Sequence, residues 1–397
     1  MRPRLLHVFS TLAVGGPQVR TAELVSGFGD AFEHVFVAAD GRMEALHRLR
    51  FEGPVRRRDL AFDKGRGLAV ANLRRVARLV TEERPSLLLT YNFGALEAAL
   101  ANRLWCRLPH LHLEDGFGPE ESPERQIPRR VWLRRLALGR RSQLVVPSRT
   151  LERLALDVWK LPRARVHHIP NGIDVARFAA RPRAGDEAAA DRPVRVGAVG
   201  ALRAEKNLAR LLRAAAEVAR THPLEVHLAG DGPERATLAG LARELGLDVR
   251  FHGHVAAPET LLAELDLYAL SSDTEQMPYG LLEAMAAGLP VVATDVGDVG
   301  ALVAPSNRPF VVARDDRAAF TAALDQLVAE PERRVNLGGD NREHARRHYG
   351  LALMLQRHRA LLDAAIAGAG DTSAASPVAS PPPTPSGAGG RLQDVDT

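Results

Sequence analysis

The feature that most constrains this chain is an alternation of short apolar segments with longer amphipathic segments, which occurs twice along its 397 residues. In the first half, segments of strand length precede segments whose apolar residues recur at helical spacing. We predict strands at Leu5–Phe9, His34–Ala38, Ser86–Thr90, Leu111–Leu113 and Leu144–Pro147, and helices at Thr21–Gly27, Leu68–Glu83 and Leu96–Cys106. Strands that alternate with helices in this way indicate βαβ units and a parallel sheet.

The alternation fades across residues 179–193, which are rich in Ala, Arg, Pro, Asp and Glu, and then restarts. Strands are predicted at Val194–Val199, Leu224–Ala229, Asp248–Phe251, Leu265–Ala269, Val291–Thr294 and Phe310–Val312, and helices at Leu208–Thr221, Pro233–Leu245, Pro258–Glu264, Pro278–Ala287 and Arg317–Glu330. We therefore expect two Rossmann-like α/β domains, 1–178 and 194–350, joined by a linker at 179–193. A last helix is predicted over 351–367, and residues 368–397, dense in Pro, Ser, Gly and Ala, are expected to be disordered.

Composition limits the setting in which the chain works. Its single cysteine, Cys106, excludes an intramolecular disulfide, and no apolar run reaches the roughly 18–20 residues that span a bilayer. The first residues show no cleavage-like tail after their short apolar run. We expect a reduced, cytoplasmic protein whose membrane contact, if it has one, is peripheral on the inner face of the cell membrane.

The net charge of +5 is divided unevenly along the chain. Residues 1–178 contain 30 Lys and Arg against 19 Asp and Glu, whereas the remainder contains 23 against 29. This asymmetry indicates that the first half meets phosphate groups or a lipid surface. No nucleic-acid-binding module is evident in the sequence, so nucleic acid is not expected as a partner.

The segment Arg129–Arg141 contributes six arginines and one tryptophan without a single acid. Basic residues interleaved with apolar ones are typical of a helix that lies on anionic lipid. A helix packed on its own domain with a solvated basic face explains the pattern as well. Both interpretations stay open on the sequence alone.

A polar stretch from Gly200 to Asn207 directly follows a strand and precedes a helix. Ligands of open parallel sheets bind beyond the carboxyl ends of the strands, where a helix start also offers free N–H groups to an anion. Arg203 and Lys206 would reach a diphosphate there. The stretch is neither a P-loop nor a GxGxxG motif, and two solvated cations at a helix start are the alternative.

Two carboxylates flank the start of the helix predicted at 278–287. Glu275 lies in the preceding loop and Glu283 about five residues into the helix, roughly 7–8 Å further along its axis at 1.5 Å per residue. Ionised carboxylates accept hydrogen bonds from paired hydroxyls, so the two could hold different parts of one elongated sugar or nucleoside ligand. The alternative is that Glu275 only caps the helix and Glu283 lies on the surface.

Two glycine-containing turns are consistent either with a purely structural role or with a loop that contacts a ligand. Ala229-Gly230-Asp231-Gly232-Pro233-Glu234 joins a strand end to a helix that begins at proline, and Pro170-Asn171-Gly172-Ile173-Asp174 carries a strong Asn-Gly turn signal at the domain edge.

In chain order, the turn at Pro170–Asp174, the loop at Gly200–Asn207, the turn at Ala229–Glu234 and the segment with Glu275 and Glu283 resemble the retaining glycosyltransferases of the GT-B fold. The last segment runs into Glu-Ala-Met-Ala-Ala-Gly-Leu-Pro-Val-Val-Ala-Thr, which begins at Glu283 and is part of the resemblance. The chain is similar to members of glycosyltransferase family 4, the bacterial group 1 enzymes. The likeness covers about residues 1–367 and is sharpest from Val166 to Val303. It implies two Rossmann-like domains whose parallel sheets face each other across a cleft, with helix 351–367 crossing back to the first domain.

The resemblance also implies roles for the candidate residues. Residues 194–350 would hold a nucleotide-sugar donor and residues 1–178 a glycan or lipid-linked acceptor. Arg203 and Lys206 would bind the donor diphosphate, Glu275 the donor sugar and Glu283 the ribose hydroxyls. Backbone groups would assist from Gly15, Gly16, Gly200, Gln276, Met277, Pro278, Tyr279, Gly280 and Leu281. Neither a metal nor a cofactor is implied, and a UDP-sugar is favoured over GDP- or ADP-sugars as co-substrate.

The first domain departs from the family pattern at two places. Gly15-Gly16-Pro17-Gln18 lacks the carboxylate that relatives often carry at its fourth position. The place of a histidine that contacts the donor sugar is filled by Asp115, so Asp115 and His112 are joint catalytic candidates, although a histidine within an apolar strand is often structural. Two alternatives therefore remain: a non-catalytic nucleotide-sugar-binding subunit, and a sugar-phosphate synthase on the same fold.

Overall fold

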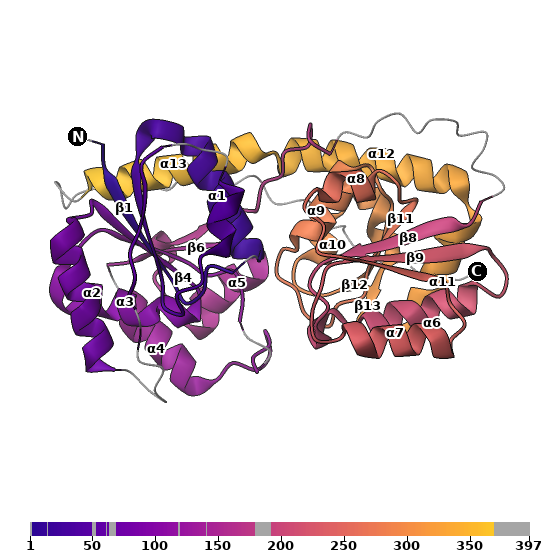
Figure 1. The fold of residues 1–397 in the computed structure, drawn as a ribbon, viewed down its shortest axis with the longest axis horizontal. Helices are drawn as coiled ribbons and strands as arrows, with labels where there is room; N and C mark the ends of the chain where they lie inside the picture. The colour runs from indigo at the N-terminus through magenta and orange to yellow at the C-terminus, as the bar shows by residue number, and fades with distance from the viewer. Residues whose placement is uncertain are drawn as a thin grey trace, which may run out of the picture.

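The computed structural model describes residues 2–13, 15–49, 53–60, 62, 69–117, 120–139, 141–178 and 192–368. Most of the predicted linker at 179–193 and nearly all of the predicted disordered tail at 368–397 lie outside these residues. The described chain forms two lobes side by side, and two long helices at its end run across both of them (Figure 1).

The first lobe is built on a seven-stranded sheet in the order β3-β2-β1-β4-β5-β6-β7, with every described pairing parallel. Its strands are β1 (Arg4–Phe9), β2 (Glu33–Ala38), β3 (Val55–Arg57), β4 (Leu87–Tyr91), β5 (His110–Leu113), β6 (Gln143–Val146) and β7 (Val166–His168). Its α-helices are α1 (Gly16–Phe28), α2 (Val70–Glu83), α3 (Leu96–Ala101), α4 (Pro128–Leu138) and α5 (Arg149–Arg153).

The second lobe repeats the scheme with a six-stranded parallel sheet in the order β10-β9-β8-β11-β12-β13. Its strands are β8 (Val194–Val199), β9 (Leu224–Ala229), β10 (Val249–Gly253), β11 (Leu267–Leu270), β12 (Val291–Asp295) and β13 (Val311–Ala313). Its helices are α6 (Leu208–Val218), α7 (Arg235–Glu244), α8 (Pro258–Leu262), α9 (Tyr279–Ala286), α10 (Val299–Leu302), α11 (Arg317–Ala329) and α12 (Pro331–His348). The last helix, α13 (Leu351–Ala367), follows α12. The predicted fold class, two parallel α/β sheets with helices around them, is confirmed.

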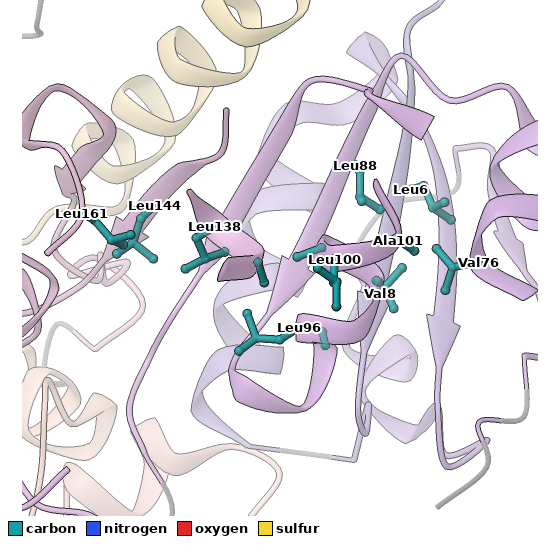
Figure 2. Close-up of a cluster of buried hydrophobic side chains, with 14 of the residues drawn as sticks. Leu6, Val8, Val76, Leu88, Leu96, Leu100, Ala101, Leu138, Leu144 and Leu161 are labelled. Carbon is teal, nitrogen blue, oxygen red and sulfur yellow. The ribbon is translucent and has the colours of Figure 1, made fainter. Parts of the chain in front are cut away.

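Apolar residues on the strands explain why helices cover the sheets. In the first lobe, Leu6, Val8 and Leu88 project from neighbouring strands toward Val76 of α2 and Leu96 of α3, and all five are buried (Figure 2). Burying a side chain of this size stabilises the fold by roughly 1.5–3 kcal/mol, so a cluster of this kind fixes the helices on the sheet. The carboxyl ends of the strands thereby acquire fixed positions.

Some elements of the structure differ from the predicted ones in their bounds, and others were not predicted. α1 begins at Gly16, with Gly15 as its N-cap and Pro17 in its first turn, five residues before the predicted start. The short strands β3 and β7 were not predicted because each has only three residues. The whole of α12 was missed, since its sequence is mostly polar and gives little apolar periodicity.

The last two helices belong to different lobes. α12 packs against α9 in the second lobe, whereas α13 packs against α1 and β5 in the first (Figure 1). Gly27 of α1 lies so close to α13 that a Cβ there would stand 2.5 Å from Leu355. The chain therefore returns to its first lobe.

Candidate functional site

A lysine and a carboxylate meet where two strands of the second sheet end. The loop after β8 passes through a short 3-10 turn, η8 (Ala204–Lys206), and the loop after β11 carries Glu275. Lys206 Nζ lies 2.5 Å from Glu275 Oε1, and Ser272 Oγ donates to the same oxygen at 2.7 Å. The two side chains are 26% and 9% exposed, so the pair is reachable from the cleft and is not part of the core.

Glycines let the surrounding loops approach one another closely. Gly230 has φ +133°, and a Cβ on it would stand 1.8 Å from the carbonyl oxygen of Gly200, itself at φ +154°. Gly297 has φ +59°, and a Cβ on it would stand 2.1 Å from the carbonyl oxygen of Glu275. The Gly230 turn therefore supports the Gly200 loop, and Gly297 supports the loop that carries Glu275.

Glu283 lies one turn into α9 and opens on a different space. It lines a cavity of about 500 Å³ between the lobes, together with Tyr279 and His254 of the second lobe and Glu23 and Glu44 of the first. Glu275 and Glu283 thus face separate parts of the cleft, as an elongated ligand would require.

Arg203 is the one predicted cation that the structure does not place at the Lys206–Glu275 pair. Its side chain is 61% exposed, and its nearest carboxylate, Glu205, is 3.9 Å away. It lines a surface hollow with Arg213 and Glu234 instead. Arg203 would have to turn to reach a ligand held by Lys206.

The segment from Gln276 to Leu281 connects the two lobes. Ser148 Oγ donates to Gln276 Oε1 at 3.1 Å, and Asn171 Nδ2 donates to the carbonyl of Met277 at 3.0 Å. Pro278 precedes α9 as its N-cap, and Leu281 is fully buried, which leaves that residue only its backbone for a ligand.

Gly280 and Tyr279 follow at the start of the helix. A Cβ on Gly280 would stand 2.6 Å from Tyr268 Oη and 2.7 Å from the carbonyl of Val199, so α9 lies directly over the end of β8. The Tyr279 hydroxyl is buried without a hydrogen-bond partner among the described residues, and burial raises its pKa.

Across the cleft, a buried ion pair stands behind the glycine turn of the first lobe. Arg20 of α1 is fully buried; its Nη2 donates to Asp115 Oδ2 at 2.9 Å and its Nη1 lies 3.4 Å from Asn171 Oδ1. Burial raises the pKa of the Asp115 carboxyl, and the charge of Arg20 opposes that rise. Gly16 lies opposite the ring of Tyr279, because a Cβ on Gly16 would stand 3.6 Å from it. Gly16 therefore faces the second lobe's ligand loop, and so does Gly116, the residue after Asp115, on which a Cβ would stand 3.5 Å from Gln276.

His112 occupies a different position from the one that a catalytic role requires. Its side chain is fully buried in β5, with Nδ1 2.7 Å from Thr90 Oγ1 and Nε2 3.1 Å from Glu114 Oε2. Both ring nitrogens are used inside the lobe, so the structure favours the structural interpretation of His112. Asp115 is then the candidate that reaches the cleft.

The basic helix α4 also differs from the expectation of a lipid-facing cationic surface. Arg134 is fully buried between Glu114 and Glu121, and Arg130 pairs with Glu120 and Glu121. Arg135 donates to the backbone carbonyls of residues 158 and 159. Much of the charge that the sequence displays at 129–141 is thus used within the lobe, and Arg140 lies outside the described residues.

Four residues of this site were not singled out from the sequence: Arg20, Asn171, Ser148 and Asp298, whose carboxylate accepts from the backbone N–H of Thr150 in the first lobe. Asn171 belongs to the Asn-Gly turn noted above, where the sequence predicted a turn but no function for the asparagine side chain. The other three depend on contacts between segments more than ninety residues apart, which no local pattern reveals.

The described residues contain neither a cluster of metal ligands nor a membrane-spanning helix. No group of three or more His, Cys, Asp or Glu side chains there is arranged to hold a metal ion. No helix in the described ranges has the length and apolar character needed to cross a bilayer.

Comparison with protein families gives two matches that together cover most of the chain. Residues 14–177 match the model described as Glycosyltransferase Family 4, and residues 193–330 match that of the Glycosyl transferases group 1. A 2-deoxystreptamine N-acetyl-D-glucosaminyltransferase of Streptomyces fradiae is 30% identical over 305 residues, which cover 68% of this chain and 72% of that protein.

Other relatives match over shorter stretches. A GDP-mannose-dependent alpha-mannosyltransferase of Mycolicibacterium smegmatis is 32% identical over 51% of this chain and 52% of its own length. A glycogen synthase of Mycobacterium tuberculosis is 34% identical over 42% of this chain and 41% of its own. The chain therefore aligns with only about half, or less, of these two proteins.

Solved structures show the same fold over nearly the whole chain. HepE of Anabaena, crystallised with UDP, superposes with a TM-score of 0.75 at 20% identity, over 91% of this chain and 100% of that one. The sucrose-phosphate synthase of Thermosynechococcus elongatus gives a TM-score of 0.72 at 18% identity, over 92% and 100%. At these identities the likeness establishes the architecture.

Proposed function

Because the chain belongs to the group 1, or family 4, glycosyltransferases and has the GT-B fold, we propose that it transfers a sugar from a nucleotide-sugar donor to a glycan or lipid-linked acceptor. We propose retention of the anomeric configuration, no requirement for a metal, and a role in cell-surface polysaccharide or glycolipid synthesis. A UDP-sugar is the proposed donor, in line with the UDP held by the Anabaena structure.

The observation that carries this proposal is the Lys206–Glu275 pair at the strand ends. Without a ligand, each side chain neutralises the other. A donor diphosphate would attract the ammonium of Lys206, and Glu275, still held by Ser272, would then offer a carboxylate oxygen to a hydroxyl of the donor sugar. As the nucleoside diphosphate leaves and its charge grows, Lys206 would stabilise the transition state more than the ground state.

The remaining roles follow from position. Arg203 would turn from the surface to add a second cation at the diphosphate, and Glu283 would accept hydrogen bonds from the ribose in the cavity between the lobes. Asp115, held by Arg20, would face the reacting sugar from the first lobe. The Gly15-Gly16 turn and the backbone of residues 276–280 would surround the donor phosphates and exclude water.

The acceptor determines where the enzyme must work. A lipid-linked acceptor requires a cytoplasmic enzyme that rests on the inner face of the membrane, which we propose for this chain. The charges along α4 do not locate that surface, because Arg130 and Arg134 pair with carboxylates of their own lobe.

The test is to incubate the purified protein with UDP-, GDP- and ADP-sugars in EDTA and to measure release of the nucleoside diphosphate. We expect slow release from the UDP series, and its loss in Lys206→Ala. The matched control is Arg220→Ala, which removes an exposed cation from the same lobe. Release that needs an added metal would overturn the metal-independent proposal. Binding without release in the presence of candidate acceptors would favour a binding subunit.

A further inference from the structure

Four arginines converge on a pocket at the end of the first lobe that lies away from the cleft. A hollow of about 570 Å³ is lined by Arg103, Arg107, Arg135 and Arg141, and His110 and Ser142 form part of its wall. We call it the arginine pocket. His110 begins β5 and Ser142 directly precedes β6, so the pocket lies at the amino ends of these strands, whereas the donor site lies beyond carboxyl ends.

The pocket is cationic in a way that the arginine-rich composition alone does not explain. None of its described lining residues is acidic, and among the described residues no carboxylate lies within ion-pair distance of Arg103, Arg107 or Arg141. Arg130 and Arg134, by contrast, each have carboxylate partners nearby. Cations gathered around one hollow repel each other, and an anion seated there would relieve that repulsion.

The backbone holds two of these arginines in defined places. Residues 102–106 form a π-helical turn that ends α3, and Arg107 follows it with φ +58°, a left-handed conformation that is unfavourable for a non-glycine residue. The buried Asn102 side chain fixes this bend, because it donates to the carbonyl of Leu108 and accepts from its N–H. π-Helical turns and strained residues of this kind concentrate at functional sites.

Arg103 lies over a glycine that leaves room for it. Gly139 has φ +38°, and a Cβ there would stand 1.7 Å from Arg103 Nη1. The close approach of the guanidinium to the backbone thus depends on a residue without a side chain.

The same π-helical turn exposes two large apolar side chains beside the pocket. Leu104 is 49% exposed and Trp105 is 48% exposed, and both directly follow Arg103. Guanidinium groups next to an exposed tryptophan and leucine match the boundary of an anionic membrane, where phosphates lie beside acyl chains and tryptophan is favoured. A soluble phosphorylated ligand would not explain why Leu104 and Trp105 are exposed beside the pocket.

We propose that the arginine pocket binds the phosphates of anionic lipid headgroups while Leu104 and Trp105 enter the membrane surface. This inference rests on the membrane contact proposed above and moves it from the face of α4 to the turn at 102–107. The pocket and the donor site are separated by at least the length of β5, four residues or about 13 Å. The contact therefore tethers the enzyme and takes no part in donor turnover.

The experiment compares binding to vesicles of phosphatidylcholine alone with binding to vesicles of equal parts phosphatidylcholine and phosphatidylglycerol. We expect binding only to the anionic vesicles, weakened about fivefold for each substitution among Arg103→Gln, Arg107→Gln and Arg141→Gln. The control, Arg243→Gln with Arg317→Gln, removes exposed cations from the second lobe and should bind as the parent does. Equal binding by all variants would overturn the proposal.

Tryptophan fluorescence distinguishes this surface from the outer face of α4. Trp159 is buried, so Trp105 and Trp132 are the tryptophans able to respond to lipid. We expect a blue shift on anionic vesicles that survives Trp132→Phe and disappears in Trp105→Phe. The reverse result would place the membrane on α4 and overturn the assignment.

Two further arms separate other sources of the effect. Inorganic pyrophosphate or a short single-stranded RNA that binds with the same arginine dependence, in the absence of vesicle binding, would show a different ligand and overturn the lipid assignment. Release of nucleoside diphosphate from a free UDP-sugar should be unchanged in the pocket variants. Loss of that release from the parent protein would instead count against the proposed sugar transfer.

Discussion

On the second-lobe side of the cleft, Lys206 and Glu275 keep 26% and 9% of their side chains exposed, whereas on the first-lobe side Arg134 and Glu114 are fully buried. Both pairs stand near the carboxyl ends of parallel strands. The exposed pair can exchange its partner for a ligand, because water and a phosphate can reach it. The buried pair cannot, because separating two charges in the interior leaves each without compensation. The two pairs thus occupy similar positions in the fold, and their burial determines which pair can bind a ligand and which one only stabilises the structure.

Arg134→Met should therefore have the largest effect of the changes considered, and the effect should be on stability. It leaves Glu114 buried without its guanidinium partner, whereas Glu121 keeps Arg130, and we expect a loss of about 3–5 kcal/mol in the free energy of unfolding. Burial alone would raise the pKa of Glu114, and Arg134 and His112 hold it below its ordinary range. Chemical denaturation measures the loss.

The control for this variant is Arg129→Met on the exposed side of the same helix, where a change within about 0.5 kcal/mol is expected. A loss below about 1 kcal/mol in Arg134→Met would mean that the buried pair does not stabilise the first lobe. The comparison between the two sides of the cleft would then fail.

The second lobe's site could be predicted from the sequence because its motifs are local. Lys206 follows a strand by seven residues, and Glu275 precedes a helix by four, so periodicity and turn signals place both at strand ends. That Glu275 would pair with Lys206 depends on two loops sixty-nine residues apart, and only the structure shows it.

The first lobe was predicted well in its strands and poorly in its site. Arg20 was not selected, because it directly precedes the helix predicted at Thr21–Gly27, where an arginine is expected on the surface, yet it is fully buried against Asp115. His112 was selected because of its place in the chain, and its two bonds within the lobe become visible only when β4 and β5 are paired. Burial of charge is a property of tertiary packing, which local sequence does not encode.

Lys206→Ala should show the opposite signature to Arg134→Met. We expect turnover to fall by about 10² or more, because a cation at the leaving diphosphate stabilises charge that develops in the transition state. Stability should change by less than about 1 kcal/mol, since the Lys206–Glu275 pair is partly exposed. Steady-state kinetics and denaturation of the same preparation measure both quantities.

Glu275→Ala extends this test to the partner residue and should also reduce turnover by about 10² if the carboxylate holds the donor sugar in the transition state. Turnover close to that of the parent in both variants would contradict the site assignment. A large loss of stability in either one would place the pair among the structural contacts.

Because some histidines are buried, we predict that the free energy of unfolding depends on pH. His34 of β2 is almost fully buried, with Nδ1 3.0 Å from His7, and burial lowers its pKa to about 4. The unfolded chain has an ordinary histidine pKa of about 6.5, so it binds protons as the pH falls below that value while the folded protein does not. His34 should therefore cost the fold about 2 kcal/mol at a pH of about 5 and nothing at a pH of about 8.

His34→Gln checks that dependence. We expect its free energy of unfolding to fall less steeply than that of the parent between a pH of about 6.5 and a pH of about 5. The control is Val335→Gln, at an exposed position of the second lobe without a titratable group, which should keep the parent's slope. Parallel curves for the parent and His34→Gln would show that this histidine is not held neutral in the folded protein.

The smallest expected effect concerns the contact that joins the two sides of the cleft. Asp298 of the second lobe accepts from the backbone N–H groups of Arg149 and Thr150 and from Thr150 Oγ1, at 2.5, 3.1 and 2.9 Å, at the start of α5 in the first lobe. Removing a carboxylate from a helix start costs about 1 kcal/mol. Because this carboxylate and this helix belong to different lobes, Asp298→Ala should destabilise the arrangement in which the two lobes are in contact. We therefore expect kcat/KM for the donor to fall about fivefold in this variant.

Asp298 also contacts the loop that carries Glu275, because its backbone N–H donates to the carbonyl of Gln276 at 3.2 Å, so a single variant could act through the donor site instead. Thr150→Val removes one partner of the same carboxylate from the first lobe, far along the chain from that loop. If the contact across the cleft is what matters, the double variant should lose less kcat/KM than the two single losses combined, because each change removes the same bond. Additive losses would instead show that Asp298 acts within its own lobe. The contacts of Ser148 and Asn171 and the packing of α13 on the first lobe would then hold the two lobes together.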